Sequence, residues 1–115
     1  MEKLTVGLCA GRHQMPVQEY IFPEISVFDP QQINDYASAW VVTKCGIRQK
    51  WGIGLNQADS EDVRVFTGEV ELVLYVTGLT VATAAVIRAC ALNGVALTLM
   101  HYDPQRGEYY PQEVF

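Results

Sequence analysis

The sequence predicts one α/β domain over residues 1–115, with a mostly parallel central sheet, flanking helices and a C-terminal hairpin. The main observation is an alternation of apolar runs and a glycine turn between residues 70 and 100. In order, these are the strand Val70–Val76, the turn Thr77–Thr80, the helix Val81–Leu92 and the strand Val95–Met100. Two apolar strands joined by one helix pair in parallel through a right-handed crossover. The pattern therefore favours a Rossmann-like sheet of about five or six strands.

Length and composition agree with a single folded domain. The chain has 115 residues, of which 50% are hydrophobic and 18% charged, a balance that disordered chains lack. Its longest apolar stretches fall short of the ~20 residues of a membrane span, and no signal peptide is visible. The three cysteines form neither a disulfide framework nor a CxxC metal site. We expect a cytoplasmic protein without a membrane association, a metal or a cofactor.

The first half of the chain contains two strands and the clearest helix. Leu4–Cys9 is typical of a buried strand, and Glu19–Pro23 is a shorter strand that ends at its proline. The helix is expected over Asp29–Cys45, because Asp29 can cap it and Pro30 suits its first position. Its apolar residues recur at helical spacing and form one core-facing stripe: Ile33, Tyr36, Ala37, Trp40, Val41 and Cys45.

The second half contributes the rest of the sheet. Gly52–Asp62 is typical of an exposed loop, and Val63–Phe66 of a strand. Val70–Val76 is apolar on nearly both faces, as a central strand would be. Asn93-Gly94 should stop the second helix, after which Asp103–Gly107 forms a turn and Glu108–Phe115 returns as an edge strand.

Charge is distributed unevenly along the chain. The formal net charge is −5, which argues against a protein that coats DNA or RNA. Residues 1–57 are neutral overall, whereas residues 58–115 carry the whole excess of acids. An anion-binding surface should therefore draw on the first half or on backbone dipoles. The basic stretch Lys44–Trp51 is interpreted as a solvated helix end rather than a nucleic-acid contact.

The turn Thr77-Gly78-Leu79-Thr80 is the first candidate ligand-binding segment. Open α/β sheets bind ligands at the carboxyl ends of their strands, and free N–H groups at a helix start favour phosphate. Gly78 would let a ligand approach the backbone, while Thr77 and Thr80 offer hydroxyls. The alternative is that Thr80 only caps the helix and Gly78 only makes a tight turn. The segment is neither a GxGxxG fingerprint nor a P-loop, so NAD and ATP are not favoured.

Two further groups of candidate residues follow strands. Gly11, Arg12 and His13 come after the first strand, where Arg can pair with phosphate oxygens and His can move a proton. The alternative is that Arg12 and His13 lie in an exposed loop without a role in binding. His101 and Asp103 close the strand that begins at Val95, and such a pair can orient a base. Asp103-Pro104 is equally typical of the start of a turn.

These residues resemble those of a known family. The segment Tyr75–Tyr110 resembles the C-terminal half of CRISPR-associated Rossmann-fold (CARF) domains, and the first strand followed by Arg12-His13 is similar to small ring-nuclease-type proteins. The resemblance implies a homodimer with a shared pocket for a cyclic oligoadenylate, which some such proteins sense and others cleave without metal. By position, Thr77, Gly78 and Thr80 would cradle a phosphate, Arg12 would contact another, and His13 would be the acid. The turn departs from the family pattern Gly-Gly-Thr-Lys by lacking the basic residue.

The sequence thus leaves two functions open. The first is binding and metal-independent cleavage of a cyclic oligonucleotide in antiviral defence. The alternative is a non-enzymatic interaction protein, of prophage or host origin, whose acidic residues meet a basic protein partner: Asp59, Glu61, Asp62, Glu69 and Glu71. In either case the apolar helix Val81–Leu92, or the last strand ending in Val114-Phe115, is expected in a homodimer interface.

Overall fold

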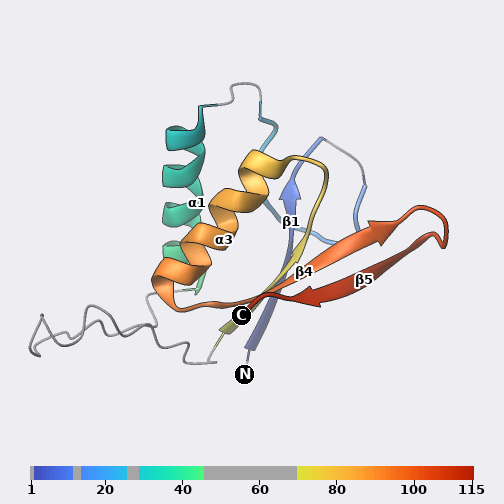
Figure 1. Ribbon diagram of the computed structural model, residues 1–115. Coiled ribbons are helices and arrows are strands. Elements are labelled where there is room, and N and C mark those ends of the chain that lie inside the picture. The colour runs from blue at the N-terminus through green and yellow to red at the C-terminus, as the bar shows by residue number, and fades with distance from the viewer. Residues whose placement is uncertain (1, 12–13, 26–28, 46–69) are drawn as a thin grey trace, which may run out of the picture.

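The computed structural model describes residues 2–11, 14–25, 29–45 and 70–115, and it confirms the predicted fold class (Figure 1). Five strands form one sheet in the order β2-β1-β3-β4-β5. Their bounds are Glu2–Cys9 (β1), Tyr20–Phe22 (β2), Val70–Tyr75 (β3), Ala96–Asp103 (β4) and Glu108–Glu113 (β5). Neighbours from β2 to β4 pair in parallel, and β5 returns antiparallel to β4 as a C-terminal hairpin. The predicted loop at 52–62 and strand at 63–66 lie outside the described residues.

The described helices, α1 (Pro30–Cys45) and α3 (Thr80–Asn93), pack against each other beside the sheet (Figure 1). The crossovers from β2 to β3 and from β3 to β4 run in the same direction across the sheet. Right-handed connections that run in one direction place their helices on one face. The opposite face carries no described helix.

Helix α1 begins as the sequence predicts. The Asp29 carboxylate accepts a hydrogen bond from the Gln31 N–H at 3.0 Å, and the Asp29 carbonyl accepts one from Ile33. Asp29 is therefore the N-cap. The buried stripe is narrower than expected, since it consists of Ile33, Ala37, Val41 and Cys45. Tyr36 is 46% exposed, and its ring stacks on Phe22 with centroids 5.1 Å apart.

Helix α3 is short of bulky side chains, which lets it lie close to α1. Its buried residues are small or branched: Ala82, Ala85, Val86, Ala89 and Cys90. The helix ends at Gly94, whose left-handed φ of 68° lets its N–H reach the Cys90 carbonyl, as the Asn93-Gly94 stop predicts. The expected Thr80 cap is wrong. Leu79 occupies the N-cap, no side chain caps the helix, and Thr80 is the first helical residue.

Strand β3 lies in the middle of the sheet, as its apolar sequence predicts. Leu72 and Leu74 are fully buried on the helix side. The expectation of burial on both faces is wrong for the described residues, because Val73 and Tyr75 on the other face are half-buried. There the Thr98 hydroxyl of β4 donates a hydrogen bond to Oε2 of Glu71 at 2.6 Å.

The three cysteines are buried, and none of them forms a disulfide. Burial raises the pKa of the Cys90 thiol well above its ordinary value, and nearby Cys45 raises it further. Within the described residues, no helix is long and apolar enough to span a membrane, and no group of His, Cys, Asp and Glu could hold a metal ion.

Candidate functional site

A polar cavity of about 270 Å³ lies where β3 and β4 end and α3 begins. It is lined by Val76, Thr77, Gly78, His101, Tyr102 and Tyr110. The parallel register sets Tyr75 beside Met100, so Thr77, which follows β3, and His101, which lies within β4, meet at one edge of the sheet. The Val76 N–H donates to the Met100 carbonyl at 3.1 Å and extends this pairing by one residue. The fold thus brings the glycine turn and His101 to one cavity.

Gly78 leaves the approach to this cavity open. It is exposed, and a Cβ added at Gly78 would meet no heavy atom within 4 Å. A positive φ, which would demand glycine, occurs in the described residues at Gly11, Gly94 and Gly107 and not at Gly78. A side chain at position 78 would therefore not strain the backbone. A larger residue would instead occupy the path of a ligand.

The start of α3 favours an anion. Its first turn contains no acidic residue, so no acidic side chain of that turn offsets the positive end of the helix dipole. The oxygen of the Thr77 hydroxyl is buried and finds no hydrogen-bond partner among the described residues. A buried hydroxyl without a partner costs free energy that a ligand atom can recover.

The other two residues of the turn play smaller roles. Leu79 is 9% exposed and belongs to the core, while its carbonyl accepts from the N–H and the hydroxyl of Thr83. The Leu79 carbonyl therefore stabilises the helix start, while its side chain packs in the core and does not line the cavity. Thr80 is exposed and does not line the cavity.

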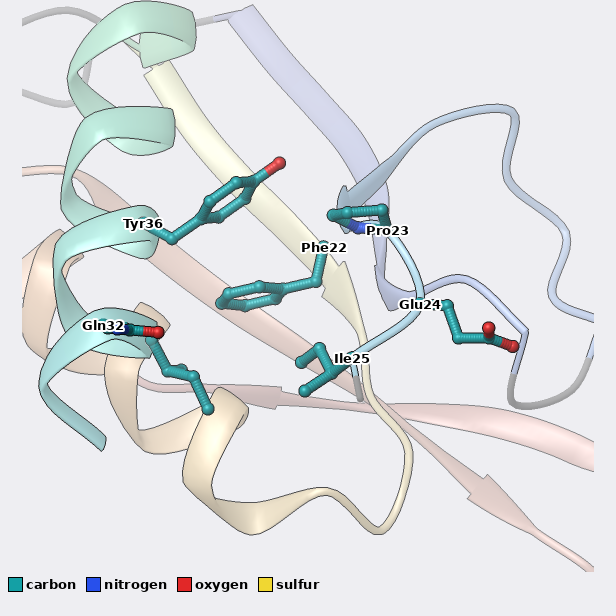
Figure 2. A pocket seen from close by; sticks show the side chains of 7 residues that line it. Phe22, Pro23, Glu24, Ile25, Gln32 and Tyr36 are labelled. Atoms are coloured by element: carbon teal, nitrogen blue, oxygen red, sulfur yellow. The ribbon is translucent and has the colours of Figure 1, made fainter. Parts of the chain in front are cut away.

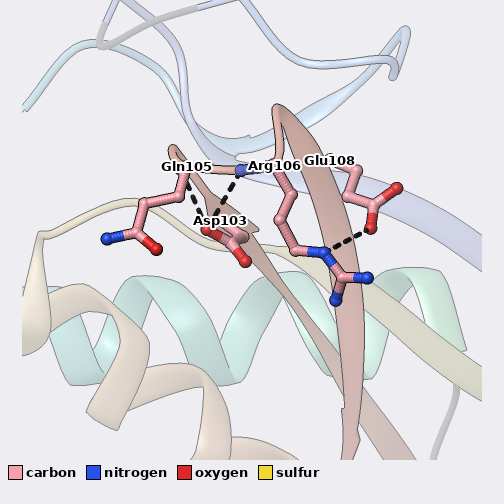
Figure 3. A network of polar contacts seen from close by, with 4 residues as sticks. All are labelled: Asp103, Gln105, Arg106 and Glu108. Atoms are coloured by element: carbon pink, nitrogen blue, oxygen red, sulfur yellow. Dashed lines mark hydrogen bonds and ion pairs between the residues drawn. The ribbon is translucent and has the colours of Figure 1, made fainter.

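His101 is held by the neighbouring strand rather than by Asp103. Its Nε2 lies 2.7 Å from Oε1 of Gln112, and its ring centroid lies 5.4 Å from that of Tyr110. The expected His101–Asp103 pair is wrong, because the Asp103 carboxylate accepts hydrogen bonds from the N–H groups of Gln105 and Arg106 (Figure 3).

Asp103 instead closes the β4–β5 hairpin. Its carbonyl also accepts a bond from the N–H of Gly107, whose φ of 67° suits a tight turn. Arg106 and Glu108, both largely exposed, form an ion pair at 3.4 Å across this turn (Figure 3). Asp103 does not line the cavity, so the turn interpretation holds for this residue.

Of the candidates after β1, the structure describes Gly11. Gly11 has a φ of 80°, and a Cβ added there would lie 3.0 Å from Oε2 of Glu24. It does not line the cavity, and the carboxylate beside it disfavours an anion. Arg12 and His13, the predicted catalytic residues, lie outside the described residues.

A second hollow, missed in the sequence, lies between the end of β2 and the first turns of α1 (Figure 2). Its volume is about 200 Å³, and its lining is mostly apolar: Phe22, Pro23, Glu24, Ile25, Gln32, Ile33 and Tyr36. The stacked rings of Phe22 and Tyr36 form its wall, while the Glu24 carboxylate points away from them (Figure 2). The sequence offered no signal for this hollow, because the helical spacing places Tyr36 in the core-facing stripe, whereas its side chain is exposed.

A tyrosine cluster, also missed, lies on the sheet face that carries no described helix. The Tyr109 ring meets Tyr75 edge-on at 4.7 Å and Tyr102 at 5.1 Å. Burial raises the pKa of Tyr109, and the neighbouring tyrosines raise it further. The rings come from three strands, so their meeting depends on strand order and not on spacing along the chain.

Comparison of the sequence with protein-family models, curated proteins and solved structures gives no significant match. The class of the protein therefore rests on its own sequence, fold and cavity. It is a small α/β protein with a mostly parallel sheet and a polar cavity at the carboxyl ends of two parallel strands.

Proposed function

We propose that the chain binds a cyclic oligoadenylate through the cavity between the Thr77-Gly78 turn and His101. The observation that carries the proposal is the buried Thr77 hydroxyl, which has no partner among the described residues. It lies beside the N-terminus of α3, whose first turn contains no acidic residue. Both features are satisfied by a phosphate oxygen. The class of ligand comes from the resemblance to CARF-type proteins, which is carried by the same turn.

The cavity also offers a surface for a base. Tyr110 lines it and is 51% exposed. Nucleobases stack on exposed aromatic rings, and such stacking tolerates any base. A phosphate on the Thr77-Gly78 backbone would place the attached nucleoside toward the β4–β5 hairpin, where Tyr110 stands.

The size of the cavity bears on the assembly. At about 270 Å³ it is smaller than the ~300–1,000 Å³ of typical small-molecule sites. One chain therefore accommodates a part of a cyclic oligonucleotide, and the proposal includes a cytoplasmic homodimer in which each copy holds one part.

Turnover is the second half of the proposal. A ligand 2′-hydroxyl would attack the adjacent phosphorus, forming a 2′,3′-cyclic phosphate and breaking the bond to the 5′-oxygen. His13 would give its proton to that leaving oxygen, Arg12 would stabilise the charged phosphate, and solvent would take the hydroxyl proton. This half rests on the position of both residues directly after β1 in the sequence.

The alternative, an acidic interaction protein, gains no support from the described residues. Of its five acidic residues, Glu71 alone lies in the described part of the chain. Its carboxylate accepts the Thr98 hydroxyl at 2.6 Å and thereby joins β3 to β4.

The test is a titration with cyclic tri-, tetra- and hexa-adenylate, read as thermal stabilisation. A ligand at 100 times its dissociation constant should stabilise the folded state by about 2.7 kcal/mol. Linear oligoadenylates of equal length are the matched control for the ring. Failure of all three rings to stabilise the protein at millimolar concentration would refute the proposal.

A further inference from the structure

The cavity has one side chain that can become positively charged within the described residues, namely His101. The other lining residues are Val76, Thr77, Gly78, Tyr102 and Tyr110, and none of these can be a cation. The turn that precedes α3 also lacks a basic residue. A phosphate in this cavity would therefore meet backbone dipoles, the hydroxyls of Thr77 and the two tyrosines, and one imidazole.

Gln112 determines how that imidazole can act. An amide oxygen only accepts, so the 2.7 Å contact from Oε1 of Gln112 requires a proton on Nε2 of His101. Neutral His101 then keeps a bare lone pair on Nδ1, which repels a phosphate oxygen. Protonated His101 carries a hydrogen on Nδ1 and can donate it.

The charged groups around His101 leave its imidazolium available to a ligand. Asp103, two residues along β4, is engaged by two backbone N–H groups of the hairpin turn. Glu108 on β5 pairs with Arg106, and the first turn of α3 carries no acid. The face of Tyr110, 5.4 Å away, attracts a cation.

We infer that protonated His101, oriented by Gln112, is the group that recognises the phosphate of the ligand. His101 is then a ligand-binding residue and Gln112 its positioning residue. This inference rests on the proposed binding site. It makes affinity for a phosphodiester fall as pH rises, because the ligand keeps one negative charge per phosphate while the imidazole loses its own.

The test measures affinity for cyclic tetra-adenylate at pH 6 and pH 8, by calorimetry, in the parent and in three variants. The parent should bind about tenfold more tightly at pH 6, since a hydrogen bond from a charged donor is the stronger one. His101→Gln should bind weakly and equally at both values. Gln112→Glu should move the fall in affinity to higher pH, because a carboxylate stabilises the imidazolium. Glu113→Gln, exposed and next along β5, is the control and should follow the parent.

The outcomes separate this inference from the proposed function. A parent that binds equally at both pH values, or a His101→Gln variant that keeps the pH dependence, would overturn the role of His101 and leave ligand binding intact. If cyclic tetra-adenylate fails to bind at either pH, the dinucleotide adenylyl-adenosine is the second probe. Binding of that probe that depends on His101 and pH would support the inference without the ring; absence of binding would refute it.

Discussion

The N–H of Val76 donates a hydrogen bond to the carbonyl of Met100 at 3.1 Å, one residue past the end of β3. This bond extends the parallel pairing of β3 and β4 to the residue just before each candidate site residue. Thr77 follows the donor and His101 follows the acceptor. The meeting of these two residues at one cavity is a consequence of parallel pairing, since neither is near the other in sequence.

Gly78→Val should fold normally and lose ligand binding. A Cβ at this position meets no heavy atom within 4 Å and no positive φ opposes it, so stability should change by less than about 0.5 kcal/mol. Its branched carbon would stand where a phosphate approaches the backbone. Thermal melts and calorimetric titration measure the two effects. A folded variant that binds like the parent would place the ligand elsewhere.

Thr77→Val should have opposite effects on stability and on binding. The substitution replaces a buried hydroxyl that finds no partner in the described structure with a methyl group of similar size. The free protein should gain about 1 kcal/mol of unfolding free energy, and affinity should fall. Thr77→Ser keeps the hydroxyl and is the control. Loss of stability in Thr77→Val would mean that the hydroxyl has a partner in solution.

Thr80→Ala should have little effect. Because Thr80 neither caps α3 nor lines the cavity, its loss should cost less than the ~1 kcal/mol of a true N-cap. Asp29→Ala provides the contrast, since Asp29 does cap α1 and its removal should cost about 1 kcal/mol. Chemical denaturation of both variants measures the loss of stability. Equal losses would contradict the finding that Asp29 caps α1 while Thr80 does not cap α3.

Asp103→Ala should lower stability and leave binding unchanged. The carboxylate accepts two backbone hydrogen bonds in the hairpin turn, so its loss should cost about 1 kcal/mol. It does not line the cavity. A tenfold loss of affinity without a loss of stability would restore Asp103 to the ligand site.

Alkaline pH should destabilise the protein through Cys90. Burial raises the pKa of this thiol above its ordinary value, so the unfolded chain releases the proton first. This contribution to stability is intact below the ordinary thiol pKa of about 8.5 and declines as pH rises above it. Denaturation midpoints between pH 7 and 10 should fall in the parent and fall less in Cys90→Ala. If the midpoints of the parent and of Cys90→Ala fell equally with pH, the loss of stability would not come from Cys90.

Local patterns sufficed for most of the fold. Asp29 and Pro30 fixed the start of α1, Asn93-Gly94 fixed the end of α3, and the run after residue 70 predicted a central strand. These signals act over a few residues of the chain, because helix capping and the spacing of apolar residues determine where an element begins, where it ends and which type it is. The C-terminal hairpin follows from how few ways such elements connect. The strand order was not predicted, because it depends on pairing between segments far apart in sequence.

The candidate site was predicted less completely, because side-chain partners depend on strands far apart in sequence. His101 is bound to Gln112 across the hairpin and not to Asp103 beside it. The register of β4 and β5 decides this pairing, and no local pattern encodes it. The tyrosine cluster was missed for the same reason.

The central claim is that a cyclic oligoadenylate binds at the cavity of Thr77, Gly78 and His101, and amide chemical shifts test it most directly. On addition of cyclic tetra-adenylate, the largest changes should fall on residues 76–80 and 101–102, with little change at 33–41 of α1. Saturable chemical-shift changes confined to the hollow of Phe22 and Tyr36, or no changes at millimolar ligand, would contradict the claim.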